Sequence, residues 1–421
     1  MMENKLTNEQ ILCRIKGNDK TLTVLRVGNS NDNCYTFTSG FSLLGKFIAK
    51  NTQLSILDVS LYDRHGTALE IADRDFFDAL RNNTSICDLH LRSNDDRRYV
   101  ISDVGYQILI AYQENCSSLT SLTIQSIDAS NDNGDLFIAT VRSCIYLTRI
   151  AFRRCNVSNN MLLPIVGTLR RSNLLTQLFL SGNRIGDIGC RAIAQLLEDS
   201  SNNLQSLGLS FNDIGNAGAK ILFDSLRNNK KLKELHLFGN PIDENVQDDI
   251  SRVLCSPLNI NSTYSSNHVL EILTVPYQCC EQLAYLLELN KTGDKKHVAM
   301  KKILKYHPMF DIEPLFKWDS KVELSVKGLP YIVAWFERAL QSVSNEEGGC
   351  KNVEQRKLSA IYQFALAVPL HFVPILPTKP IILLYWGQCH RIQELKSQVQ
   401  ALKDQYKCKE RGIQSSRLCT A

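Results

Sequence analysis

The chain has 421 residues, of which 44% are hydrophobic and 22% are charged, and its formal net charge is +5. This composition is typical of a folded globular protein, and so small a charge excess argues against a nucleic-acid or acidic-membrane partner. The 14 cysteines are scattered singly apart from Cys279-Cys280, and the N-terminus shows no secretory signal. We therefore expect free thiols and a cytoplasmic protein.

One pattern recurs from residue 22 to about residue 279. It reads L-x-x-L-x-L-x-x-N/C-x-L, and its eight copies begin at residues 22, 54, 86, 119, 147, 175, 204 and 232. The steps between copies are 32, 32, 33, 28, 28, 29 and 28 residues. A period of this kind predicts a solenoid of stacked repeats. Residues 1–21 are expected to cap it, and a degenerate ninth copy lies at 270–278.

Each copy predicts a short strand followed by a helix. The L-x-L alternation has the period of a strand, which buries the leucines and turns the intervening residues outward. The second half of each copy has apolar residues at helical spacing and ends in Asn, as in "LFDSLRNNKKL". Parallel strands stack about 4.8 Å apart whereas packed helices need about 8–10 Å, so the stack must curve with its helices outside.

Asparagine recurs where each strand should end. Its carboxamide both donates and accepts hydrogen bonds, so a buried Asn can satisfy the backbone of the turn. We predict a buried asparagine ladder formed by Asn94, Asn183, Asn212 and Asn240.

These residues resemble the leucine-rich-repeat family, and the 28–29-residue step resembles its ribonuclease-inhibitor-like class. The resemblance covers roughly residues 22–260. It implies an α/β fold, a leucine-rich-repeat solenoid (horseshoe) with parallel strands inside and helices outside. Such folds leave their concave sheet face open, and that face is the natural place for a partner.

The outward positions of the L-x-L segments predict where a partner binds. They are basic in the middle repeats and aromatic, with an acid, in the later ones. Aromatic and Arg side chains are enriched at protein-binding hot spots. We expect the site to contain Arg149, Arg153, Phe179, Phe211, Glu234, His236 and Phe238.

The composition changes after the repeats. Nine of the 11 prolines and all three tryptophans lie beyond residue 250. Residues 280–370 are expected to form an α-helical C-terminal extension, and 371–390 a Pro-rich apolar strap without a membrane span. Residues 391–421 form a tail with seven basic and three acidic side chains. Its heptad positions at 392–406 are too few to hold a coiled coil alone, so we expect a monomer, with a dimer through 392–406 as the alternative.

No motif indicates a cofactor, a metal or catalysis. The segment Gly40–Lys46 fits G-x-x-x-x-G-K, but Phe47 stands where a phosphate-binding loop needs Ser or Thr, so a repeat helix is expected. We therefore predict a cytoplasmic protein-binding scaffold that is not an enzyme and binds no nucleic acid or membrane. The alternatives are a GTPase-activating or enzyme-inhibitor module of the same repeat class, and an enzyme hosted in the C-terminal helical region.

Overall fold

The computed structural model describes residues 7–28, 41–62, 68–71, 74–93, 99–114, 118–130, 132–292 and 294–307. The chain divides into two compact units, one comprising residues 1–256 and 265–295 and the other 257–264 and 296–421. The first unit contains the repeats. Asn94, the strap at 371–390, the tail at 391–421 and the extension beyond residue 307 lie outside the described residues.

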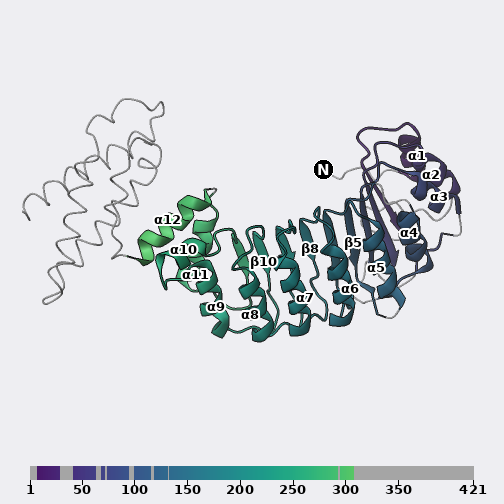
Figure 1. Cartoon of the computed structure of the whole chain (residues 1–421). Helices are drawn as coiled ribbons and strands as arrows, with labels where there is room; N and C mark the ends of the chain where they lie inside the picture. Colours follow the sequence, from purple (N-terminus) through teal and green to yellow (C-terminus); the bar gives the residue numbers. More distant parts are fainter. Residues whose placement is uncertain are drawn as a thin grey trace, which may run out of the picture. The chain divides into compact units, whose positions relative to one another are not determined.

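The described strands of the repeats form one parallel sheet whose spatial order follows the chain (Figure 1). The strands of this sheet are β1 (Val24–Gly28), β2 (Ile56–Tyr62), β3 (Asp88–Ser93), β5 (Ser121–Gln125), β7 (Arg149–Arg153), β8 (Gln177–Phe179), β9 (Ser206–Gly208), β10 (Glu234–His236) and β11 (Ile272–Thr274). A separate pair joins β4 (Tyr99–Val100) to β6 (Ile127–Asp128). Strand β11 lies in the degenerate ninth copy of the repeat.

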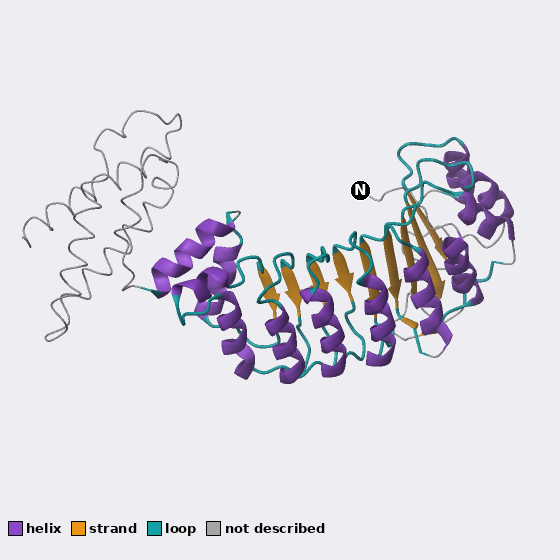
Figure 2. Cartoon of the chain, in the orientation of Figure 1, coloured by secondary structure: helices purple, strands orange, loops and turns teal. Residues whose placement is uncertain are grey.

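A helix follows most of the strands and packs on one face of the sheet, so the other face stays open (Figure 2). The helices of the first unit are α1 (Asn8–Lys16), α2 (Phe41–Ile48), α3 (Arg74–Asn82), α4 (Asp103–Glu114), α5 (Asp132–Ser143), α6 (Asn159–Leu169), α7 (Asp187–Glu198), α8 (Asn216–Ser225), the 3-10 turn η1 (Glu244–Val246), α9 (Gln247–Leu254) and α11 (Glu281–Asn290). Helices α10 (Ile260–Ser265) and α12 (Lys295–Tyr306) lie almost wholly in the second unit. Helix α2 occupies the segment that fits a phosphate-binding loop, and it buries Phe41, Leu44 and Ile48.

The core is built in register. The central leucine or isoleucine of each strand pairs with its counterpart in the next, as in Leu178, Leu207 and Leu235, and these three side chains are completely buried. Each contributes about 2 kcal/mol through burial. Each repeat contributes a strand and, in most cases, a helix, and the repeats stack on one another. The fold is therefore the α/β leucine-rich-repeat solenoid that the sequence pattern predicts.

The asparagines at the strand ends bind the backbone of two repeats at once. The Nδ2 of Asn212 donates to the carbonyls of Leu209 in its own repeat, at 2.9 Å, and of Leu180 in the preceding repeat, at 3.0 Å, while its Oδ1 accepts from the N–H of Ile185 at 3.1 Å. Asn183 and Asn240 repeat this pattern. Cys155 stands at the same position one repeat earlier, where its Sγ lies 3.3 Å from the carbonyl oxygen of Ile124.

A second set of asparagines lies at the opposite end of the repeats, where each helix returns to a strand. The Nδ2 of Asn229 donates to the carbonyl of Leu197 in the preceding helix at 2.7 Å, and its Oδ1 accepts from the N–H groups of Lys231 and Leu232. Asn202 instead donates to the carbonyl of Leu196 in its own repeat, at 2.8 Å, but the arrangement of Asn229 holds for Asn51, Asn83 and Asn267. These buried carboxamides link consecutive repeats, because they satisfy carbonyls that a helix end leaves unpaired.

Candidate functional site

The residue just before each ladder position has an unusual backbone conformation. Its φ is positive in five consecutive repeats, at Ser126, Arg154, Gly182, Phe211 and Gly239. This conformation lets the N–H group of Phe211 donate to the carbonyl of Phe238 in the next repeat at 2.7 Å, beyond the end of the strands. Glycine adopts a positive φ freely, whereas in any other L-residue this conformation costs about 1 kcal/mol or more.

Phe211 therefore occupies a place that two other repeats give to glycine. Its side chain is 60% exposed, so it gains little from burial. The ring lies directly on Gly239, because a Cβ at that glycine would come within 2.5 Å of Cδ1 of Phe211. Phe238 meets the same ring edge to face at 5.5 Å between centroids and is itself 51% exposed. We call Phe211 and Phe238 the aromatic pair.

Phe179 lies one repeat away from this pair and has different neighbours. Its ring rests on Gly208, where a Cβ would come within 2.6 Å of its Cδ1. The guanidinium carbons of Arg149 and Arg153 lie 5.2 and 5.4 Å from the centroid of the same ring. Arg149 also donates to Oε1 of Gln177 at 3.4 Å. We call Arg149, Arg153 and Phe179 the arginine stack.

The two arginines of this stack repel each other on one aromatic ring. Burial, and after it the positive charge of Arg149, lowers the pKa of Arg153 below its ordinary value. Neither guanidinium forms an ion pair with a carboxylate among the described residues. The ring stabilises both cations through its negative face, and a negative group of a partner would stabilise them further.

Glu234 and His236 lie on β10, in the same repeat as Phe238, and β10 pairs with β9 and β11. Oε2 of Glu234 accepts a hydrogen bond from Oγ of Ser206 at 2.8 Å and lies 3.7 Å from Nε2 of His236. Nδ1 of His236 lies 3.3 Å from Oγ1 of Thr274 on β11. The two side chains are thus held in a polar network on the open face of the sheet.

The structure does not bring the three phenylalanines into one continuous strip. Within the described residues, a ring contact joins Phe211 to Phe238, whereas Phe179 packs with Arg149 and Arg153. Sequence reasoning missed the glycines that create this division. A signal was available, since Gly208 and Gly239 stand in the L-x-L segment and its turn, at positions where other repeats have larger residues.

Among the described residues, no group of three or more His, Cys, Asp or Glu side chains could hold a metal ion. Among the same residues, no helix is both long and apolar enough to cross a membrane.

Comparison with known proteins agrees with the repeat architecture. The family model "Leucine Rich repeat" matches residues 171–194, 200–222 and 228–244. The porcine (Sus scrofa) ribonuclease inhibitor is 30% identical over 137 residues, which are 32% of this chain and 29% of the inhibitor. The mouse (Mus musculus) protein "NACHT, LRR and PYD domains-containing protein 4E" is 26% identical over 181 residues, which are 41% of this chain and 18% of that protein. The actin-binding site 2 structure of leiomodin-1 aligns with a TM-score of 0.33 and 20% identity, over 38% of this chain and 91% of that one.

These findings confirm the class expected from the repeats. The chain is a leucine-rich-repeat protein of the ribonuclease-inhibitor-like class. The matched stretch covers less than a third of either named relative.

Proposed function

We propose that this chain is a protein-binding scaffold whose partner docks on the open sheet face of repeats five to eight. The observation that carries the proposal is Phe211, an exposed aromatic residue in a backbone conformation that disfavours it. Neither its burial nor its φ stabilises the fold, and strain of this kind is concentrated at functional sites. Its contact with Phe238 and the glycine beneath it present two rings in one fixed arrangement.

The neighbouring charges indicate what such a partner carries. The arginine stack offers two cations without an ion pair among the described residues, one repeat away from the aromatic pair. A partner segment with an apolar side chain for the aromatic pair and a carboxylate for the arginine stack would match both groups. Glu234 and His236, in the same repeat as Phe238, would then align the segment beside the aromatic pair through polar contacts.

An enzyme-inhibitor module is the second candidate function. It is supported by the 30% identity with the porcine ribonuclease inhibitor. In that case the same face would bind an enzyme and block it, so the two candidates share a site and differ in the partner's nature. The proposed setting is the cytoplasm, which suits the eight described cysteines, all of which are free thiols.

Capture of partners from a native lysate, followed by affinity measurement on the captured protein, tests the site. Phe238→Ala should weaken binding about thirtyfold, equivalent to about 2 kcal/mol, with little loss of stability. Ile188→Ala is the matched control, because Ile188 is 60% exposed but belongs to α7 on the helical side. If Phe238→Ala instead lowers the free energy of unfolding by about 3–5 kcal/mol, the ring belongs to the core and the proposal fails.

A further inference from the structure

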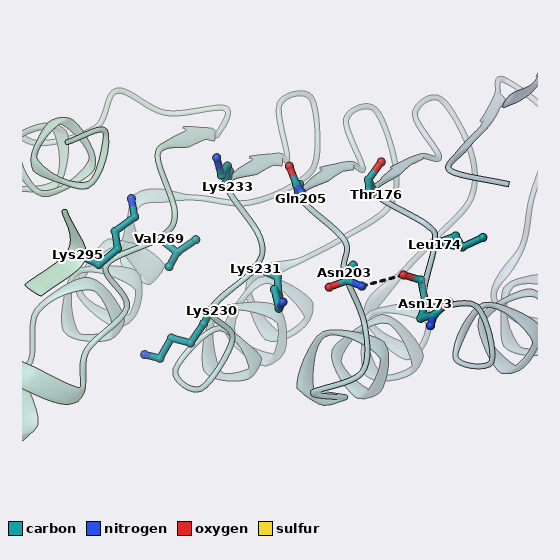
Figure 3. A pocket seen from close by; sticks show the side chains of 10 residues that line it. All are labelled: Asn173, Leu174, Thr176, Asn203, Gln205, Lys230, Lys231, Lys233, Val269 and Lys295. Atoms are coloured by element: carbon teal, nitrogen blue, oxygen red, sulfur yellow. Dashed lines mark hydrogen bonds between the residues drawn. The ribbon is translucent and has the colours of Figure 1, made fainter. Parts of the chain in front are cut away.

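A second surface feature lies at the other end of the strands, where the chain enters each strand from the preceding helix. It is a shallow hollow of about 490 Å³ that extends over the sixth to ninth repeats (Figure 3). Thr176, Gln205 and Lys233 each stand directly before a strand of the sheet and line its rim. The hollow is thus separate from the aromatic pair, whose residues follow the strands.

The hollow is strongly basic. Lys230, Lys231, Lys233 and Lys295 line it, and Lys295 alone meets an acid, since its Nζ lies 3.3 Å from Oε1 of Glu271. The other three have no carboxylate partner among the described residues. Among the described residues, Lys230 donates to the carbonyls of Ser265 and Ser266, both at 3.4 Å. Desolvation of its ammonium group lowers its pKa, as expected of a cation held against the protein without a counter-charge.

The rest of the lining is polar and fixed in place. The Nδ2 of Asn203 donates to the carbonyl of Asn173 at 2.8 Å, which links two repeats across the floor of the hollow (Figure 3). The backbone N–H groups of Gln205 and Lys233 are already bonded to the carbonyls of Thr176 and Gln205. A ligand must therefore be recognised by side chains, through carboxamides and a hydroxyl at one end and ammonium groups at the other.

We propose that this hollow, which we call the lysine hollow, binds an acidic segment of a protein, a short extended stretch rich in Asp or Glu. The first and last repeats that line the lysine hollow are three strand spacings apart, a distance of about 14 Å. An extended peptide of about four residues spans this distance. The carboxamides of Asn203 and Gln205 can bond the peptide backbone of such a segment, and the lysines its carboxylates. The inference does not depend on the proposed function of the aromatic pair.

The lining favours a peptide over a nucleic acid for two reasons. No aromatic side chain of the described residues lines the lysine hollow, so unpaired bases would find no stacking surface there. The described cations that line it are all lysines, and lysine lacks the planar guanidinium group with which arginine forms bidentate hydrogen bonds to phosphate. The ammonium groups of the lysines can pair with carboxylates, and the neighbouring carboxamides can form hydrogen bonds with an extended peptide backbone.

Fluorescence anisotropy with the full chain and a labelled peptide of five glutamates flanked by Gly-Ser tests the inference. The double variant K231Q/K233Q should lower the affinity about tenfold and flatten its dependence on salt, because both groups act through charge. The matched control is K20Q/K50Q, which removes the same charge from two exposed lysines near the N-terminus. This control should stay within about twofold of the unaltered chain.

Three outcomes would overturn the inference. They are no measurable binding by the unaltered chain, an equal loss in both double variants, and tighter binding of an oligouridylate probe through Lys231 and Lys233. Phe238→Ala should leave peptide binding unchanged, so a failure of the aromatic pair as a partner site would not be mistaken for a failure of the lysine hollow. All four lysines changed in these variants are exposed, and melting curves would verify that the variants fold.

Discussion

The first three repeats and repeats five to eight present different surfaces on the same face of the sheet. In the first three, the charges of the open face neutralise one another. Asp58 lies between two arginines of neighbouring strands, with Oδ1 at 2.8 Å from Nε of Arg92 and Oδ2 at 3.6 Å from Nε of Arg26. His90 lies beside them, with Nε2 at 3.0 Å from Oδ1 of Asp88. Further along the sheet, neither guanidinium of the arginine stack forms an ion pair with a carboxylate among the described residues.

The two regions also differ in length. The early repeats are 32–33 residues long and their strands have five to seven residues, whereas β8, β9 and β10 have three residues each. A longer strand sets more side chains of neighbouring repeats directly opposite each other, which favours cross-strand ion pairs. A short strand reaches its turn sooner, and there a residue such as Phe211 projects from the sheet. Similar repeats can therefore build either a self-neutralised face or an open one.

The largest expected change in stability comes from removing one asparagine of the ladder in the later repeats. Asn212→Ala removes three buried hydrogen bonds, two of which join neighbouring repeats, and we expect it to lower the free energy of unfolding by about 2–3 kcal/mol. Urea denaturation measures this loss. Asn203→Ala is the control, because its half-exposed side chain makes one such bond, and its effect should be under about 1 kcal/mol. Equal midpoints for both variants would show that the ladder does not stabilise the repeats.

A second variant tests whether the early face is neutralised as its geometry indicates. Asp58→Asn leaves the guanidinium groups of Arg26 and Arg92 without their shared carboxylate, and the side chain of Asp58 is only 11% exposed. We expect a loss of about 2 kcal/mol in stability, because hydrogen bonds to charged groups are worth more than neutral ones. Partner binding at the aromatic pair should not change. A stability like that of the unaltered protein in urea would mean that the early charges contribute nothing through pairing.

The third comparison isolates the backbone strain at Phe211. Both Phe211→Ala and Phe211→Gly remove the ring, but only the glycine variant relaxes the positive φ. The glycine variant should therefore be more stable than the alanine variant by about 1 kcal/mol, and both should bind the partner weakly. Parallel melting curves decide the point. If alanine proves the more stable of the two, the strain is absent and the main argument for a functional Phe211 is lost.

The smallest effect concerns pH. Burial alone would raise the pKa of Asp88, but the hydrogen bond from His90 and the charges of His90 and Arg149 outweigh it, so its pKa is lowered. A depressed carboxyl pKa stabilises the folded state at pH values above the unfolded pKa of about 3.9, and this contribution is lost as the pH falls through the folded value. Because Asp88 is partly exposed, we expect less than about 1 kcal/mol. Asp88→Asn should flatten the loss of stability between pH 5 and pH 3, and an identical pH profile for both proteins would contradict the assignment.

The repeat architecture can be predicted from the order of the residues. The spacing of Leu178, Leu207 and Leu235 predicts strands, their register and their burial, because a strand alternates its side chains and a solenoid repeats each contact with its neighbour. The offset of Asn183, Asn212 and Asn240 likewise placed them at equivalent turns, where the structure shows the same hydrogen bonds.

The contacts on the open face of the sheet become visible only when the repeats are stacked. The sequence shows three phenylalanines on consecutive repeats, but not that Gly208 and Gly239 seat two of their rings or that two arginines enclose Phe179. It also does not reveal that Asp58 is shared by two arginines or that lysines distant in sequence line one hollow. The period of the repeat predicts which side chains are buried, because equivalent positions in each copy have the same surroundings. Pairing across the surface depends on the distance and direction of side chains from different repeats, which only the stacked backbone fixes.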